Sequence, residues 1–337
     1  MIPVLRSHRH LIIAMFLSMV GALVYANTLN NGFVYDDRVV VVDDPQIRDF
    51  GHWRSIIGDP RVLKTLTFMV DYQVWGLSPF GYHLTNIVLH LLVTMTLYVL
   101  VYTMTGITRL ALITSLVFAV HPIHTEVVAN IANRKDALAT LFVLLALLFY
   151  IKRGASGWRL GLSLTAYVLA LLSKEVVGLA FLPLVVLQDL CYRVHGEGRG
   201  VQRTVRDYGP FVLVSFVGLV WLIAVKPVGY GVVNPWTLPL AEHLVTVLRA
   251  FSNYLVLLVW PLDLNADHVV ERSQSVLDPA ALIATAVMVT VLIVARWSHA
   301  FSRHLSFGFW WMVVAWLPIS NVIPVTAYYV EIGRAHV

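Results

Sequence analysis

The stretch FVYDDRVVVVDDPQ, residues 33–46, places two pairs of adjacent aspartates directly after an apolar run. Adjacent carboxylates near a low-dielectric medium resist joint ionisation, which separates their pKa values. Asp43 and Asp44 precede a proline, so turn chemistry accounts for them. Asp36 and Asp37 lie in a stretch without glycine or proline, where an Asx-rich turn is a weaker explanation. The first pair is therefore our candidate for catalysis: one carboxylate acts as general base, and the other orients a cation or a metal.

A second group of reactive side chains lies in HPIHTEVVANIANRKD, residues 121–136. The proline near its start can end a membrane span or begin a short surface helix. In such a helix, spacing of i, i+4 and i+8 would place three polar residues on one face: Glu126, Asn130 and Arg134. His121, His124 and Glu126 could bind zinc, but their spacing matches none of the common helical zinc motifs. We expect a hydrogen-bonded polar face near the lipid headgroups, with a divalent metal as the alternative.

Polar residues also follow one face of an apolar segment that begins near residue 83, namely His83, Asn86, His90 and Thr94. In lipid such a stripe must face protein or water, because an unsatisfied polar group costs several kcal/mol. Hydrogen bonding between helices is one interpretation, and contact with a substrate is the other. Lys174 and Glu175 end a further apolar segment, where ionisable residues are candidates for function. Snorkelling to the interface would explain Lys174 equally well.

The composition defines the class of protein that must position these groups. Of 337 residues, 58% are hydrophobic and 13% are charged, with a mean hydropathy of +0.76. A soluble domain cannot bury that much apolar surface, so we expect a polytopic membrane protein. The net charge of +5 comes from scattered Lys and Arg without a basic stripe, which favours a membrane surface over nucleic acid. One cysteine, Cys191, excludes an intramolecular disulfide and a thiolate metal cluster.

A spanning helix needs about 20 apolar residues. The sequence predicts an all-α fold with about nine such spans: 11–29, 83–105, 108–122, 136–151, 159–173, 176–190, 210–226, 279–296 and 305–324. Segment 244–262 is also apolar, but Arg249 and Asn253 interrupt it. We therefore predict an interfacial or re-entrant helix there. Further interfacial helices are expected in the outer loops.

The distribution of charge predicts the orientation. Short segments rich in Arg and Lys fall on one side, which the positive-inside rule makes cytoplasmic. Nearly all acidic residues fall on the other side, so that side is expected to hold the chemistry. Residues 1–26 fit a retained first helix better than a cleaved signal peptide, because the apolar run is long. Under either interpretation, Asp36 lies outside.

Several motifs in order resemble one family: GFVYDDR (32–38), TLTFMVDY (65–72), GLSPFGYHLTNIVLH (76–90), FAVHPIHTEVVANIANRKD (118–136), LLSKE (171–175) and LPISNVIP (317–324). Together they resemble the membrane domain of the transmembrane and tetratricopeptide-repeat O-mannosyltransferases and their bacterial relatives. FAVHPIHTE and SPFGYHLTN are the specific parts. The resemblance implies the C-type glycosyltransferase (GT-C) fold and a sugar donor on a polyprenyl phosphate, which is dolichyl-phosphate mannose in eukaryotes.

The resemblance also implies roles for residues. Asp36 and Asp37 match the acidic motif that holds the catalytic acid, and Arg61 matches an arginine that proline usually follows. Val62 and Thr94 depart from the family pattern, since relatives often have proline and asparagine there. We assign the base to Asp36, which would deprotonate an acceptor hydroxyl as its oxygen attacks the anomeric carbon with inversion. The departing phosphate needs a cation, for which Arg61, Arg134 and Lys174 are the candidates.

The expected partners are therefore a polyprenyl-phosphate-linked sugar, a polypeptide or glycan acceptor, and the lipid bilayer, without nucleic acid. No cofactor is assigned, and a divalent metal stays an alternative. We expect a multi-pass protein of the bacterial inner membrane, or of the endoplasmic reticulum in a eukaryote, with its active site on the periplasmic or lumenal side. Two other classes are open: a secondary transporter, and a membrane scaffold that anchors a repeat domain.

The end of the chain predicts an incomplete domain. The tail EIGRAHV, residues 331–337, back-translates to a common sequencing-adapter start. We expect residues 1–330 to form a GT-C-like transmembrane domain and 331–337 to be foreign to it. The resemblance implies tetratricopeptide repeats of ~34 residues downstream.

Overall fold

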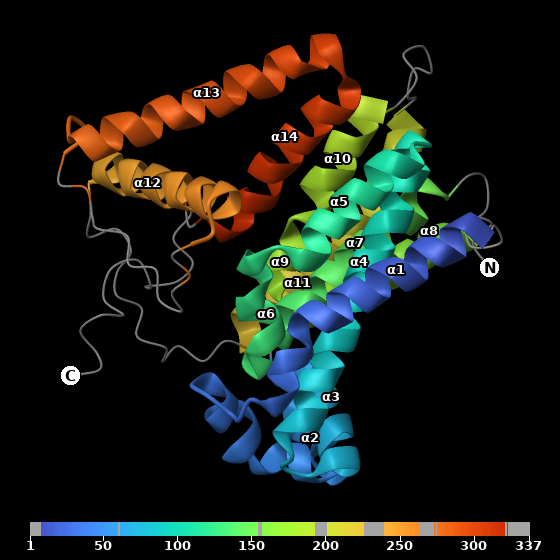
Figure 1. The fold of residues 1–337 in the computed structure, drawn as a ribbon. Helices are drawn as coiled ribbons and strands as arrows, with labels where there is room; N and C mark the ends of the chain where they lie inside the picture. The colour runs from blue at the N-terminus through green and yellow to red at the C-terminus, as the bar shows by residue number, and fades with distance from the viewer. Residues whose placement is uncertain are drawn as a thin grey trace. The chain divides into compact units, whose positions relative to one another are not determined.

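The computed structural model describes residues 8–59, 61–153, 157–192, 201–225, 239–262, 264, 273, 275–320 and 322. The tail at 331–337 lies outside these residues. The chain divides into two compact units, Met1–Val185 with Gly196–Lys226, and Val186–His195 with Pro227–Val337. Every regular element in the described ranges is a helix, which confirms the predicted all-α polytopic membrane class (Figure 1).

The first unit is built around one long helix, α4 (Pro79–Thr105), and all candidate site residues belong to this unit. Helix α4 packs against α1 (His8–Tyr25), α5 (Thr108–Val120) and α7 (Arg134–Ile151). Helix α7 also packs against α8 (Gly157–Ser173). The remaining helices of this unit are α2 (Trp53–Ile56), α3 (Val62–Trp75), α6 (Thr125–Ala129), α9 (Glu175–Leu179) and α11 (Val201–Val225), with the start of α10 (Phe181–Tyr192).

Several helices are long and apolar enough to cross a membrane. Within the described ranges, five apolar segments pass by length and composition: His8–Asn30, Pro79–Thr105, Glu175–Tyr192, Leu240–Val259 and Pro279–Phe301. A sixth would be Thr108–Val120 with Pro122–Ala129, which is bent by 51°. Other apolar segments form shorter helices: the segment predicted at 305–324 begins with α14 (Arg303–Trp316), followed by a short 3-10 turn.

Most of segment 244–262 belongs to one continuous helix, α12 (Leu240–Val259), which is long and apolar enough to span by length and composition. Its Arg249 does not stand unpaired in the helix: Nη1 lies 3.6 Å from a carboxylate oxygen of Asp278 and donates to Ser273 Oγ at 3.2 Å. Helix α12 also packs against α13 (Pro279–Phe301). The ion pair with Asp278, which belongs to the same second unit, therefore accounts for the charge of Arg249 within this apolar helix.

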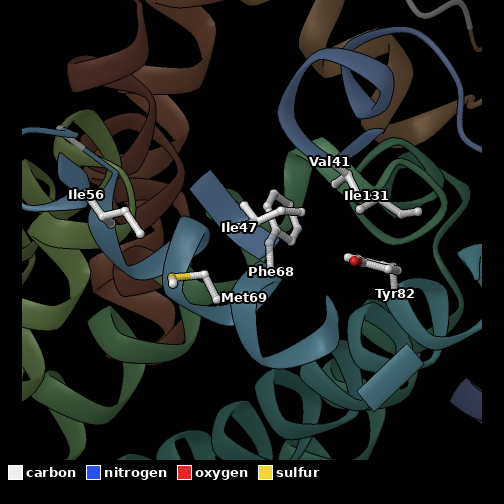
Figure 2. Packing of buried hydrophobic residues seen from close by; sticks show 7 residues of the cluster. All are labelled: Val41, Ile47, Ile56, Phe68, Met69, Tyr82 and Ile131. Carbon is white, nitrogen blue, oxygen red and sulfur yellow. The ribbon is translucent and has the colours of Figure 1, made fainter. Parts of the chain in front are cut away.

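The loop between α1 and α3 consists of short helical turns held by a hydrophobic cluster. Val41, Ile47 and Ile56 of this loop pack with Phe68 and Met69 of α3, and Tyr82 and Ile131 complete the cluster (Figure 2). Asp44 Oδ1 accepts a hydrogen bond from the Gln46 N–H at 2.8 Å and caps the 3-10 turn Pro45–Arg48. The turn interpretation of Asp44 is confirmed.

Candidate active site

Asp37 is completely buried and joins the loop between α1 and α3 to a segment distant in sequence. Its Oδ2 accepts the Val34 N–H at 3.1 Å, and its Oδ1 accepts the Ala132 N–H at 2.7 Å. Ala132 lies in the 3-10 turn Ile131–Asn133, directly before α7. Burial raises the pKa of Asp37, while the two hydrogen bonds and the nearby His83 act in the opposite direction. Because both oxygens are occupied, the geometry suits a positioning role.

Asp36, in contrast, is exposed. The backbone before it is strained: Tyr35 has φ of +45° and is the one non-glycine residue with positive φ in the described part of the chain. This conformation costs roughly 1–2 kcal/mol and persists only where neighbouring contacts enforce it. Here the Asp37 N–H donates to Val34 O at 2.9 Å, so the buried aspartate closes the turn. Two adjacent carboxylates thus have different environments, one anchored and one accessible.

Arg134 has no exposed surface, and its guanidinium group lies inside a polar network. Its Nη1 lies 2.6 Å from Asp71 Oδ2. Its Nε donates to Asn86 Oδ1 at 2.8 Å, and its Nη2 donates to Tyr82 O at 2.9 Å. Nη1 is also 3.3 Å from Thr67 Oγ1. The network joins α3, α4 and α7, so this side chain holds helices together.

The predicted polar stripe on α4 faces protein. Asn86 Nδ2 donates to Val128 O at 3.3 Å and Asn130 O at 3.2 Å. His90 Nε2 lies 3.1 Å from Ala119 O, and its ring stacks against Phe118 with centroids 5.4 Å apart. His83 and Thr94 have no exposed surface. Contacts between helices account for Asn86 and His90, while His83 lies close enough to Asp37 to affect its pKa.

The expected polar face through residues 126, 130 and 134 does not form. Helix α6 ends at Ala129, Asn130 is extended, and a separate helix begins at Arg134. Glu126 is exposed, whereas Arg134 is buried, so one helical face cannot hold both. The segment turns because it bridges α5 and α7, and a spacing rule for a straight helix does not apply to it.

The histidines of this segment form an aromatic group. His124 packs on Phe118 with ring centroids 4.2 Å apart, and its ring lies 6.2 Å from that of His121. His121 Nδ1 accepts the Ile123 N–H at 3.2 Å, so it caps the turn after α5. Among the residues that the structure describes, no group of three or more His, Cys, Asp or Glu is arranged to hold a metal.

Arg61 and Lys174 each lie beside a carboxylate. Arg61 Nε is 3.7 Å from Glu175 Oε2, and Lys174 Nζ is 2.5 Å from Asp136 Oδ1. Arg61 immediately precedes α3, and Lys174 immediately precedes α9. These predicted residues therefore lie in two ion pairs, and the Arg61 and Lys174 side chains remain partly exposed at 37% and 23%.

Comparison with known proteins gives significant relatives of one kind. The chain is 38% identical over 154 residues to "Protein O-mannosyl-transferase TMTC1" of Homo sapiens, and 34% over 201 residues to "Protein O-mannosyl-transferase F38B6.6" of Caenorhabditis elegans. It is 32% identical over 229 residues to "Protein O-mannosyl-transferase Tmtc1" of Drosophila melanogaster. Over these stretches the chain is similar to proteins of the TMTC family.

These alignments cover 41%, 54% and 62% of this chain, but only 18%, 28% and 26% of the respective relatives. The chain thus spans about a fifth to just over a quarter of the length of these TMTC proteins. No family model matches, and no solved structure matches.

Three residues near the candidate site were missed in the sequence. Asp71 is the buried partner of Arg134 and also accepts a hydrogen bond from Thr85 Oγ1 at 2.8 Å. The other two are Lys64 in α3 and Lys135 in α7, and the charges of Arg61, Lys174 and Lys64 all lower the pKa of Lys135, after burial. A buried acid in an apolar stretch was the signal for Asp71. Lys135 follows Arg134 directly, but adjacent positions on a helix do not reveal that one is buried and the other half-buried.

Proposed function

We propose that this chain is the membrane region of an enzyme that transfers a mannose-like sugar from a polyprenyl phosphate to a hydroxyl group of a polypeptide. The transfer takes place on the extracytoplasmic face with inversion at the anomeric carbon. One observation carries the proposal: an accessible carboxylate, Asp36, adjoins a buried and anchored one, Asp37, beside a group of cations. Homology to proteins named protein O-mannosyl-transferases supports this chemistry.

Asp36 is the general base. Its carboxylate takes the proton from the acceptor hydroxyl while the acceptor oxygen forms a bond to the anomeric carbon. The bond from that carbon to the phosphate oxygen breaks, and its electron pair leaves with the phosphate. One base suffices, because the phosphate leaves as an anion without needing a proton. Asp37 keeps the Asp36 backbone in place through Val34 and Ala132.

Cations on the same side receive the charge that develops on the phosphate. Arg61 and Lys174, each partly exposed, are two of these cations. Arg134 is not one of them in this proposal, because its donors are already used by Asp71, Asn86 and Tyr82. Its role is to hold α3 and α7 together. These two helices carry Lys64 and Lys135.

The lipid tail of the donor lies in the bilayer beside the apolar helices. The chain is a multi-pass membrane protein by its apolar helices. We place the site on the periplasmic face in a bacterium and on the lumenal face of the endoplasmic reticulum in a eukaryote. The basic residues at the opposite ends of the helices support this orientation.

Sugar transfer from a radiolabelled polyprenyl-phosphate donor in membranes tests the proposal. The wild-type chain is compared with Asp36→Asn and with the control Asp44→Asn, which removes a carboxylate from the same loop at a residue that caps a turn. We expect transfer by wild type and by the control, and loss with Asp36→Asn. A secondary transporter would move substrate without forming a glycosidic bond, and a scaffold would give neither result. Equal transfer by Asp36→Asn and wild type would refute the base assignment.

A further inference from the structure

Two lysines near Asp36 lack a carboxylate partner. Lys64 and Lys135 are both half-buried, yet no carboxylate of the described residues lies within ion-pair distance of either ammonium group. The other cations nearby do have one: Arg61 has Glu175, and Lys174 has Asp136. The charge available for a ligand is therefore concentrated on Lys64 and Lys135.

Both lysines are costly for the fold. Burial lowers the pKa of Lys64. Burial, together with the charges of Arg61, Lys174 and Lys64 and against the effect of Asp136, lowers the pKa of Lys135 to about 8. Each lysine also lies in the first turn of its helix, α3 or α7, where the helix dipole favours anions and disfavours cations. A bound anion would remove all of these penalties.

The two lysines lie on the same side of the first unit as the catalytic Asp36. Arg134, directly before Lys135, donates to Thr67 Oγ1 at 3.3 Å, and the Thr67 hydroxyl donates to the carbonyl of Lys64 at 2.7 Å, so the two lysines flank one contact between α3 and α7. The Asp36 carboxylate also acts on the pKa of Lys64, after burial and the stronger effects of Asp59, Arg61 and Asp44. Lys135 Nζ donates to Ala132 O at 3.2 Å and to Asn133 Oδ1 at 2.8 Å. The same turn donates the Ala132 N–H to Asp37. One short turn therefore fixes both the anchor of the acidic loop and one of the two lysines.

We propose that Lys64 and Lys135 form an anion subsite for the phosphate group of the lipid, and that this subsite holds the leaving phosphate more tightly than the intact donor. The proposal rests on the proposed function. The donor is a phosphodiester with one negative charge. When its sugar–oxygen bond breaks, the electron pair stays on the phosphate oxygen, and the phosphomonoester carries about −1.5 to −2 at neutral pH. Two ammonium groups stabilise that additional charge as it develops.

Binding of polyprenyl phosphate, the product without sugar, tests this subsite independently of turnover. The protein in detergent or nanodiscs is titrated with polyprenyl phosphate and with the intact donor, for wild type, Lys64→Gln and Lys135→Gln. We expect each variant to weaken product binding roughly tenfold, since each loses a charge-assisted contact. Donor binding should weaken less, by roughly threefold. Lys152→Gln, at the far end of the same helix as Lys135, is the matched control and should change neither.

A pH series adds a result that a purely structural lysine would not give. Since Lys135 is charged below its pKa of about 8 and neutral above it, product binding by wild type should weaken as pH rises through that value. Lys135→Arg keeps the charge, so it should bind product and lose the pH dependence near 8. The groups that act on this titration are Asp136, Arg61, Lys174 and Lys64.

The outcomes separate the two proposals. If wild type binds neither lipid, the proposed function fails. If wild type binds both lipids, but the glutamine variants bind product as tightly as wild type, the proposed function stands and the lysine subsite is overturned. An equal loss for donor and product would overturn the preference for the leaving phosphate. Retained binding by Lys64→Arg and Lys135→Arg excludes misfolding as the cause of a loss in the glutamine variants.

Discussion

Replacement of Arg134 by methionine distinguishes two roles for this side chain: a ligand of the phosphate, and a structural link between helices. The side chain has no exposed surface and lies 2.6 Å from Asp71, which is itself 7% exposed. Removal of one partner from a buried ion pair costs roughly 3–5 kcal/mol, because the other charge stays buried without compensation. The hydrogen bonds to Asn86 and Tyr82 belong to the same network, so the free energy lost with them does not add in full to that of the ion pair. We expect Arg134→Met to lower the free energy of unfolding by roughly 3–5 kcal/mol.

The assay is equilibrium unfolding in detergent micelles, followed by tryptophan fluorescence, with a double-mutant cycle. Asp71→Leu removes the orphaned carboxylate, so Arg134→Met with Asp71→Leu should recover much of the stability lost by Arg134→Met alone. Arg153→Met, just beyond the other end of α7, is the matched control. Arg153 pairs with Asp207 at 3.2 Å, and Asp207 also pairs with Arg206 at 3.3 Å, so the carboxylate keeps a partner and the loss should cost less.

Two results would refute this reasoning. The first is a stability loss below about 1 kcal/mol for Arg134→Met, which is the range of an exposed pair. The second is a double variant that is no more stable than Arg134→Met. A stable Arg134→Met with weakened donor binding would return Arg134 to the role of phosphate ligand that the sequence suggested.

Three further predictions concern the reaction and the topology. Asp36→Asn should lower turnover by roughly a hundredfold or more, the usual range for a lost general base, with donor binding unchanged; near-normal turnover would exclude Asp36 as base. Arg61→Ala and Lys174→Ala should each weaken binding of the polyprenyl-phosphate donor more than that of the acceptor, because each removes a charge-assisted contact, as isothermal titration would show. Unchanged donor affinity in both would leave them as ion-pair residues only. A cysteine at position 43 should react with a membrane-impermeant maleimide from outside, and native Cys191 should not; labelling of Cys191 alone would invert the orientation.

The membrane class could be predicted because it depends on composition. Apolar content and the length of apolar segments are properties of the sequence itself, and five segments fulfil them in the described part of the chain. The ends of individual helices were harder to predict, since apolar residues continue past the turns that end them: α14 ends at Trp316, within the predicted segment 305–324. The ion pair of Arg249 could not be predicted either, because its partner Asp278 is distant in sequence.

The candidate site could be found from the sequence, but the division of roles within it could not. The adjacent acids stood out as a pair. Their difference arises from a hydrogen bond between Asp37 and Ala132, which lie 95 positions apart. Likewise, Asn86 and Tyr82, two partners of Arg134, lie on α4, 48 and 52 positions away in the sequence, so nothing local marks Arg134 as buried. Lys64 and Lys135 were not predicted as site residues, because a lysine near the start of a helix is common. That neither forms an ion pair with a carboxylate of the described residues is visible only in the structure.

The turn Ile131–Asn133 connects the acidic loop, Lys135 and Arg134. Its Ala132 N–H fixes Asp37, while its Ala132 carbonyl and Asn133 side chain hold Lys135. Directly after it, Arg134 ties α7 to α3, which carries Lys64. A base and a phosphate subsite must keep a fixed separation if proton removal and phosphate departure are to occur together. In the proposed mechanism, this short segment sets that separation, and a rigid buried clamp next to it serves the reaction better than one more mobile cation would.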